Sequence, residues 1–118
     1  MELRVEVANA AGLRSRIEAA VKQGKLPGWR LVRERLSTNI ADTDIAFETS
    51  LDLTVGQLGS KPSQFVVYRV LDTSDHTKAS DGITRLEVAI RNRFVAPLPE
   101  TNPIDEFGPV HAEFVIHE

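Results

Sequence analysis

The chain has 118 residues, 42% hydrophobic and 26% charged, a composition typical of a globular domain rather than a disordered chain. Its formal net charge is −3, so no overall positive field favours nucleic acid or an acidic membrane surface. It contains no cysteine, which excludes disulfides, thiolate catalysis and cysteine-based zinc sites.

No segment reaches the roughly eighteen consecutive apolar residues of a membrane-spanning helix, and the first residues are charged where a signal peptide is apolar. We therefore expect a cytoplasmic protein with no membrane partner. No linker divides the chain, and residues 1–118 are expected to form a single α+β domain. Its expected architecture is one N-terminal amphipathic helix packed on a mostly antiparallel sheet of five to six strands.

A short strand opens the chain, because apolar and charged side chains alternate; its dry face carries Leu3, Val5 and Val7. A helix is predicted next, with Asn9 as its N-cap and Gly24 as the left-handed residue after its end. Apolar residues recur there at helical spacing and form one stripe against the core: Leu13, Ile17, Ala20 and Val21.

Residues 29–37 fit either a short helix or a strand, and a strand is favoured because residues 38–44 read as a hairpin connection to a strong β pattern. In residues 45–55 every second side chain is apolar or Thr49, which predicts a half-buried antiparallel strand. The apolar members of that face are Ile45, Phe47, Leu51, Leu53 and Val55.

Residues 64–72 are apolar on both faces, as in a central strand, and residues 74–82 are rich in turn formers and predict a polar loop. Residues 84–95 are interpreted as a strand. Its inward side chains would be Leu86, Val88, Ile90 and Phe94, with Asn92 as an interruption, and its outward side chains Arg85, Glu87, Arg91 and Arg93. The last predicted strand places Val110, Ala112, Phe114 and Ile116 on one side.

Two histidines and two carboxylates lie in the last eight residues. His111 and Glu113 share a strand face about 7 Å apart, a spacing that suits chelation or acid/base chemistry, whereas His117 lies roughly 20 Å from His111. A metal site would also need ligands from elsewhere, and His76, beside Asp75, is the remaining histidine. The favoured interpretation is a solvated polar face, so no catalytic residue, metal or cofactor is expected.

The arginines of residues 84–95 raise a further possibility. Arg85, Arg91 and Arg93, together with Arg30, Arg33 and Arg35, could contact phosphates. The chain has only one tyrosine and one tryptophan, however, while sheet-type RNA binders stack bases on exposed rings. Ion pairing with Glu87 accounts for these arginines better.

We therefore expect a non-catalytic binding or assembly module whose partner is another protein chain, with self-association through a sheet edge or face giving a homo-oligomer. The last strand and the proline-rich residues 97–109 are the candidate contacts. Two alternatives remain open. One is a small enzyme with an acid/base or metal site near His111 and Glu113, or at Asp75 and His76. The other is nucleic-acid binding through the arginine-bearing strand.

Overall fold

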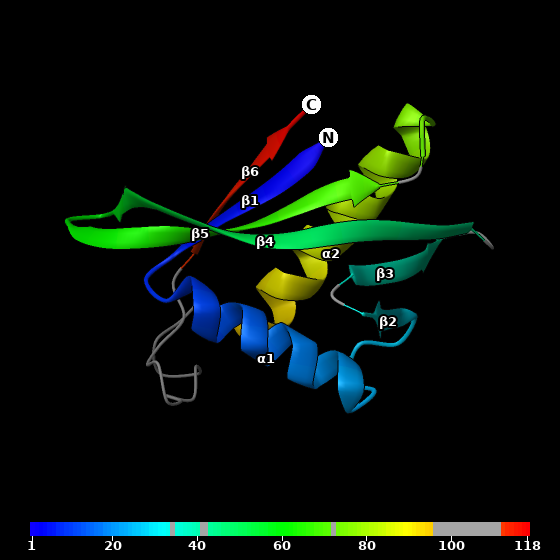
Figure 1. The fold of residues 1–118 in the computed structure, drawn as a ribbon, viewed down its shortest axis with the longest axis horizontal. Helices are drawn as coiled ribbons and strands as arrows, with labels where there is room; N and C mark the ends of the chain where they lie inside the picture. The colour runs from blue at the N-terminus through cyan, green and yellow to red at the C-terminus, as the bar shows by residue number, and fades with distance from the viewer. Residues whose placement is uncertain (34, 41–42, 72, 96–111) are drawn as a thin grey trace.

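The structure is a computed structural model that describes residues 1–33, 35–40, 43–71, 73–95 and 112–118. It has the expected α+β architecture, with two helices and a six-stranded antiparallel sheet (Figure 1). In chain order its elements are β1 (Glu2–Val7), α1 (Ala10–Lys22), β2 (Trp29–Val32), β3 (Arg35–Ile40), β4 (Thr43–Leu58), β5 (Lys61–Leu71), α2 (His76–Phe94) and β6 (Ala112–His117).

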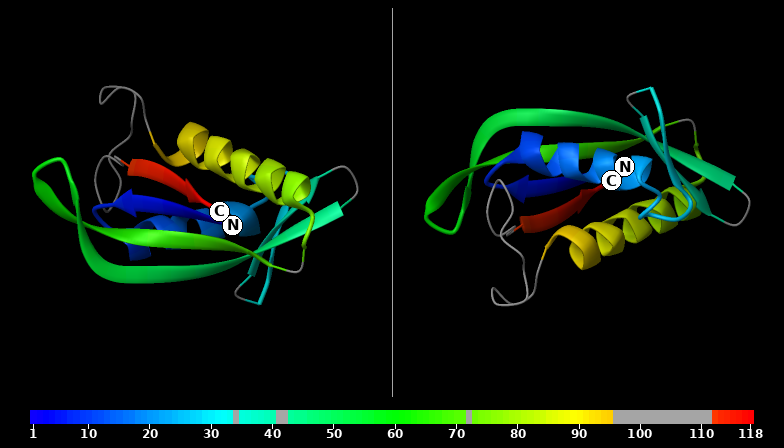
Figure 2. Two further views of the ribbon diagram at one scale, coloured as in Figure 1. Left: turned by 90° about the horizontal axis from the view of Figure 1, so that it is seen from above. Right: turned by 90° about the horizontal axis from the view of Figure 1, so that it is seen from below.

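The sheet has the strand order β2-β3-β4-β5-β1-β6, and each neighbouring pair is antiparallel. α1 packs against β1, β2 and β5, and α2 packs against β1, β3 and β4. The buried side chains of both helices belong to one apolar cluster with those of the sheet. Both helices therefore cover the same face, and the opposite face, here called the open face, carries neither α1 nor α2 (Figures 1 and 2).

The first helix forms as predicted, although β1 precedes it in the chain. The Asn9 side chain accepts a hydrogen bond from the Gly12 amide at 2.9 Å, and Gly24 has the left-handed φ of 73° that suits the residue after a helix end. The predicted stripe is buried in the core. Local capping and apolar spacing therefore suffice to explain this helix.

The segment at residues 29–37 is extended, as favoured, but it contains two strands rather than one. β2 and β3 pair in antiparallel register, with Trp29 opposite Thr38. Arg33 between them has a φ of 60°, a left-handed conformation that reverses the chain. The hairpin predicted at residues 38–44 also forms, because β3 pairs with β4. Residues 38–40 and 43–44 belong to these strands rather than to the connection.

The long β4–β5 hairpin departs from the predicted alternation near its far end. Asp52 is opposite Phe65 and Gly56 is opposite Ser63, so three residues of β4 face a single residue of β5. This bulge breaks the period of two. Leu53 and Val55 were predicted to lie on the buried face, and that prediction is wrong, since they are 65% and 69% exposed.

The largest error of the sequence interpretation concerns residues 74–95. The predicted polar loop and the predicted arginine-bearing strand are together the helix α2. Its buried positions follow the helical period over five turns: Ala79, Ile83, Leu86, Ile90 and Phe94. Val88, expected inward on a strand, is 48% exposed. Asn92 is exposed too, so it is neither a buried amide nor a bulge.

The core lies between the covered face and the two helices, and its fully buried side chains include Leu3, Val5, Leu13, Phe47, Val66, Tyr68 and Ile83. β5 is central in the sheet, as predicted, with Val66 fully buried on the covered face. On the open face Val67 is only 5% exposed, but Arg69 is exposed, so β5 is not buried along its whole length on both faces. Neither α1 nor α2, the helices of the described chain, has the length and apolar content to cross a membrane.

Candidate functional site at the open edge of the sheet

Arg4 makes the polar contacts that connect strands across the open face. It projects from β1, and its Nη2 atom lies 2.5 Å from the Asp52 Oδ2 atom of β4, so the ion pair crosses over β5. The guanidinium also lies over the Phe65 ring, 4.9 Å from its centroid. The hydrogen bond from Arg4 lowers the pKa of Asp52 to about 2, assisted by the Thr54 amide, and hydrogen bonding to Asp52 raises the pKa of Arg4. These contacts of Arg4 with Asp52 and Phe65, here called the brace, connect β1, β4 and β5 on the open face.

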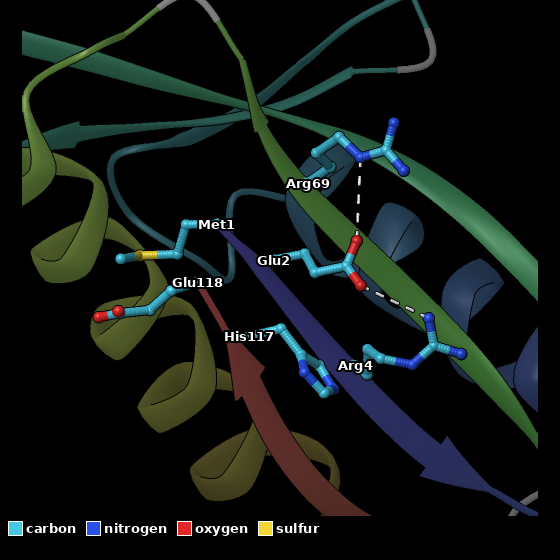
Figure 3. A pocket seen from close by; sticks show the side chains of 6 residues that line it. All are labelled: Met1, Glu2, Arg4, Arg69, His117 and Glu118. Carbon is cyan, nitrogen blue, oxygen red and sulfur yellow. Dashed lines mark ion pairs between the residues drawn. The ribbon is translucent and has the colours of Figure 1, made fainter.

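A shallow depression of about 390 Å³ adjoins this brace, lined by Met1, Glu2, Arg4, Arg69, His117 and Glu118 (Figure 3). Glu2 lies between the two arginines, 3.5 Å from Arg4 and 3.8 Å from Arg69 (Figure 3). Two carboxylates therefore balance the two guanidinium groups, so the lining carries no excess of positive charge to attract an anion.

Of the predicted acid/base residues, the structure describes Glu113 and His76 and does not bring these two together. His111 lies outside the described residues. Glu113 is exposed on the open face of β6, opposite Glu6. The His76 Nε2 atom lies 3.5 Å from the Glu118 Oε1 atom, and both side chains are mostly exposed. Glu118 is five residues beyond Glu113, about 16 Å along an extended strand, so His76 and Glu113 mark opposite ends of β6.

Asp75 already has a structural task, because its carboxylate accepts hydrogen bonds from the Thr77 and Lys78 amides and caps α2. Both bonds are accepted by its Oδ1 atom. Within the part of the chain that the structure describes, no three His, Asp or Glu side chains gather closely enough to hold a metal ion.

The arginines considered for phosphate binding are divided between two elements. Arg85, Arg91 and Arg93 are on α2, whereas Arg30, Arg33 and Arg35 belong to the β2–β3 hairpin. Arg91 pairs with Glu87 at 3.0 Å, one helical turn away, and covers the Phe114 ring at 4.3 Å from its centroid. The ion pairing expected with Glu87 exists, but it is helical rather than cross-strand.

β6 forms one end of the sheet, and among the described residues no strand pairs with its outer side. Edges are usually protected by lysine, proline, a bulge or short length. The stretch AEFVIH has no lysine, proline or glycine, and its register with β1 is unbroken over six residues. Val115 on the open face and Ile116 on the covered face are 49% and 43% exposed. This unprotected strand is the candidate site.

β2, at the other end of the sheet, likewise lacks lysine, proline and glycine and pairs in unbroken register, but it is shorter. It has only four residues, it carries Arg30, and it ends at the left-handed Arg33. Val32 is 52% exposed there, so the two edges present a valine of similar exposure in unlike surroundings. The sequence suggested β6 as an edge, but nothing in it pointed to the brace of Arg4, Asp52 and Phe65.

Comparison with known protein families, with characterised proteins and with solved structures found no match to this chain.

Proposed function

We propose that this protein is a non-catalytic interaction module that recruits another protein chain by adding a strand to its sheet at β6. The observation that carries the proposal is the unprotected outer side of β6, with Val115 and Ile116 half exposed on its two faces. Strand addition satisfies the open row of backbone groups and covers both side chains in one step.

The open-face brace supports this proposal. Arg4 joins β1, which holds β6, to Asp52 on β4. A strand template that is fixed in place loses little conformational entropy on binding, which favours association. Under the same proposal we still expect a cytoplasmic location. Fractionation of cells that produce the tagged protein tests this expectation.

The energetics indicate how large the contact must be. Covering two half-exposed aliphatic side chains contributes about 2 kcal/mol, and each new backbone hydrogen bond contributes roughly 0.5–1.5 kcal/mol. Association costs at least about 4 kcal/mol in lost freedom. These terms leave a balance of about 4 kcal/mol for a strand of six residues, which corresponds to an affinity of about 1 mM. We expect tighter binding where the partner also contacts a sheet face.

Val115→Lys tests the proposal, with Val32→Lys as its matched control on the other edge. Lysine on β6 places a charge beside the incoming strand, so we expect Val115→Lys to abolish association and Val32→Lys to leave it unchanged. Sedimentation of the purified protein at high concentration measures self-association, and affinity capture from the native extract measures binding of other proteins. A wild-type protein that stays monomeric and retrieves no partner would falsify the proposed function.

A further inference from the structure

We infer that the strand added to β6 is β6 of a second copy of this chain, antiparallel and with Val115 opposite Val115 of the other copy. This inference rests on the proposed function and specifies its partner. It follows from the order of side chains in residues 112–117, from their division between the two faces, and from the neighbour that Glu113 has within its own chain.

In an antiparallel pair centred on Val115, residues at equal distances on either side of the centre lie opposite each other. Glu113 then faces His117 of the second copy on the open face, and Phe114 faces Ile116 of the second copy on the covered face. Each carboxylate meets an imidazole and each apolar side chain meets another. Opposite residues of this kind stabilise a strand pair.

Other registers lack this match. A two-fold axis perpendicular to the sheet keeps both helix layers on one side and pairs only residues of the same face. Centring the pair on Phe114 places Glu113 opposite Val115, and centring it on Ile116 places Val115 opposite His117. Centring it on Glu113 opposes two carboxylates directly, which is destabilising.

Within its own chain Glu113 lies opposite Glu6 of β1, so its inner neighbour carries the same charge. Glu6 is engaged by the Ser63 hydroxyl, whereas the Glu113 side chain has neither a hydrogen bond nor an ion pair among the described residues. An imidazole arriving on the outer side would supply the missing opposite partner. On the covered face, Ile116 would pack beside Phe114 of the second copy, which Arg91 of that copy covers.

Single cysteines report this register directly, because the chain has none of its own. Opposite residues of an antiparallel pair have Cα atoms about 4.5–5.5 Å apart, within the range of a disulfide, whereas two copies of residue 113 would lie about 13 Å apart. We expect Val115→Cys to form a disulfide-linked dimer under mild oxidation. We expect Glu113→Cys or His117→Cys alone not to do so, although their mixture cross-links. Val32→Cys is the control for random collision.

A charge exchange tests the same contact without oxidation. Glu113→Lys replaces the carboxylate that faces the His117 imidazole of the other copy with an ammonium group, which cannot accept a hydrogen bond from that ring. The change occurs twice in each dimer, and we expect it to weaken the dimer about tenfold. Within the monomer the new lysine faces Glu6, so folding is not impaired. Adding His117→Glu should restore the dimer, and sedimentation of the wild type, the two single variants and the double variant measures each effect.

The outcomes separate this inference from the proposed function. A wild-type dimer with the expected cross-links supports both. A monomer that captures a different protein, lost in Val115→Lys, overturns the inference and leaves the proposed function standing. A dimer in which Glu113→Cys alone cross-links, or in which Val115→Cys does not, overturns the inference. A monomer without any partner overturns both.

Discussion

On the covered face of the sheet Phe47 has no exposed surface, whereas on the open face Phe65 is half-buried beneath the Arg4 guanidinium. The covered face excludes water with two helices, and the open face does so only where a few directed polar contacts cross the strands. At β6 neither the helices of the covered face nor the polar contacts of the open face cover the side chains completely. Val115 and Ile116 are therefore half exposed on opposite faces. The difference indicates that most of the stability comes from burial on the covered face, and β6 is the edge at which we propose binding.

The strongest test of this contrast compares two phenylalanines. We expect Phe47→Ala to lower the free energy of unfolding by about 3–5 kcal/mol, because it leaves a cavity in a fully buried site. Phe65→Ala should cost about 1–2 kcal/mol, since its ring is only partly removed from water. Urea unfolding of both variants measures the difference, and equal losses would show that the two faces contribute alike.

The next test concerns the close approach at the bulge of β4. A Cβ atom at Gly56 would lie 2.7 Å from both the Glu6 Oε2 atom and the Phe65 Cζ atom. We expect Gly56→Ala to destabilise the protein by about 1–2 kcal/mol through overpacking. Combining it with Glu6→Ala removes one of the crowded groups, so the two losses should be less than additive. Strict additivity would place the strain elsewhere.

A smaller effect of opposite sign is expected at Tyr68 in the core. Its hydroxyl is buried and has no hydrogen-bond partner among the described residues, and burial raises its pKa, with a further contribution from Glu18. We expect Tyr68→Phe to stabilise the fold by about 1 kcal/mol, because an unpaired buried hydroxyl is removed. Thermal and urea unfolding test this, and a loss of stability would reveal a bound water or another partner at the hydroxyl.

The smallest effect is the pH dependence of the open-face brace. The pKa of Asp52 is lowered to about 2 in the folded protein, so its contribution is fully present above the ordinary aspartate pKa and is lost as pH falls toward 2. Asp52→Asn should therefore flatten the decline in the urea midpoint between pH 5 and pH 2.5. Asp81→Asn, which removes an exposed carboxylate of α2, is the control. An unchanged pH profile for Asp52→Asn would contradict the ion pair.

The elements that carry local signals, such as capping residues or alternating apolar side chains, were predicted from the sequence. Asn9 and Gly24 delimit α1 through capping, and alternation identified β1 and most of β4. α2 was missed because Leu86, Ile90 and Phe94 satisfy a period of two and a helical spacing equally well over a short window. The misfit of Asn92 was the signal against a strand, and a window extended to Ala79 would have favoured the helix.

Only part of the candidate site could be predicted from the sequence. The alternation and final position of residues 112–117 suggested an edge strand, but edge status depends on the order of all six strands, which local patterns do not determine. The brace could not be predicted from the sequence, because Arg4 and Asp52 are 48 residues apart. They meet only after β5 has paired with both of their strands. Long-range pairing of this kind leaves no trace in spacing or composition.

The antiparallel contact between β1 and β6 joins the first and last strands of the described chain, with Glu2 opposite His117. During synthesis on the ribosome β6 follows β1 by more than a hundred residues, a delay of roughly 5–20 s at ordinary elongation rates. Throughout that interval the nascent chain exposes the side of β1 that β6 will later occupy. The outer side of β1 therefore lacks its partner strand until residues 112–117 have been synthesised.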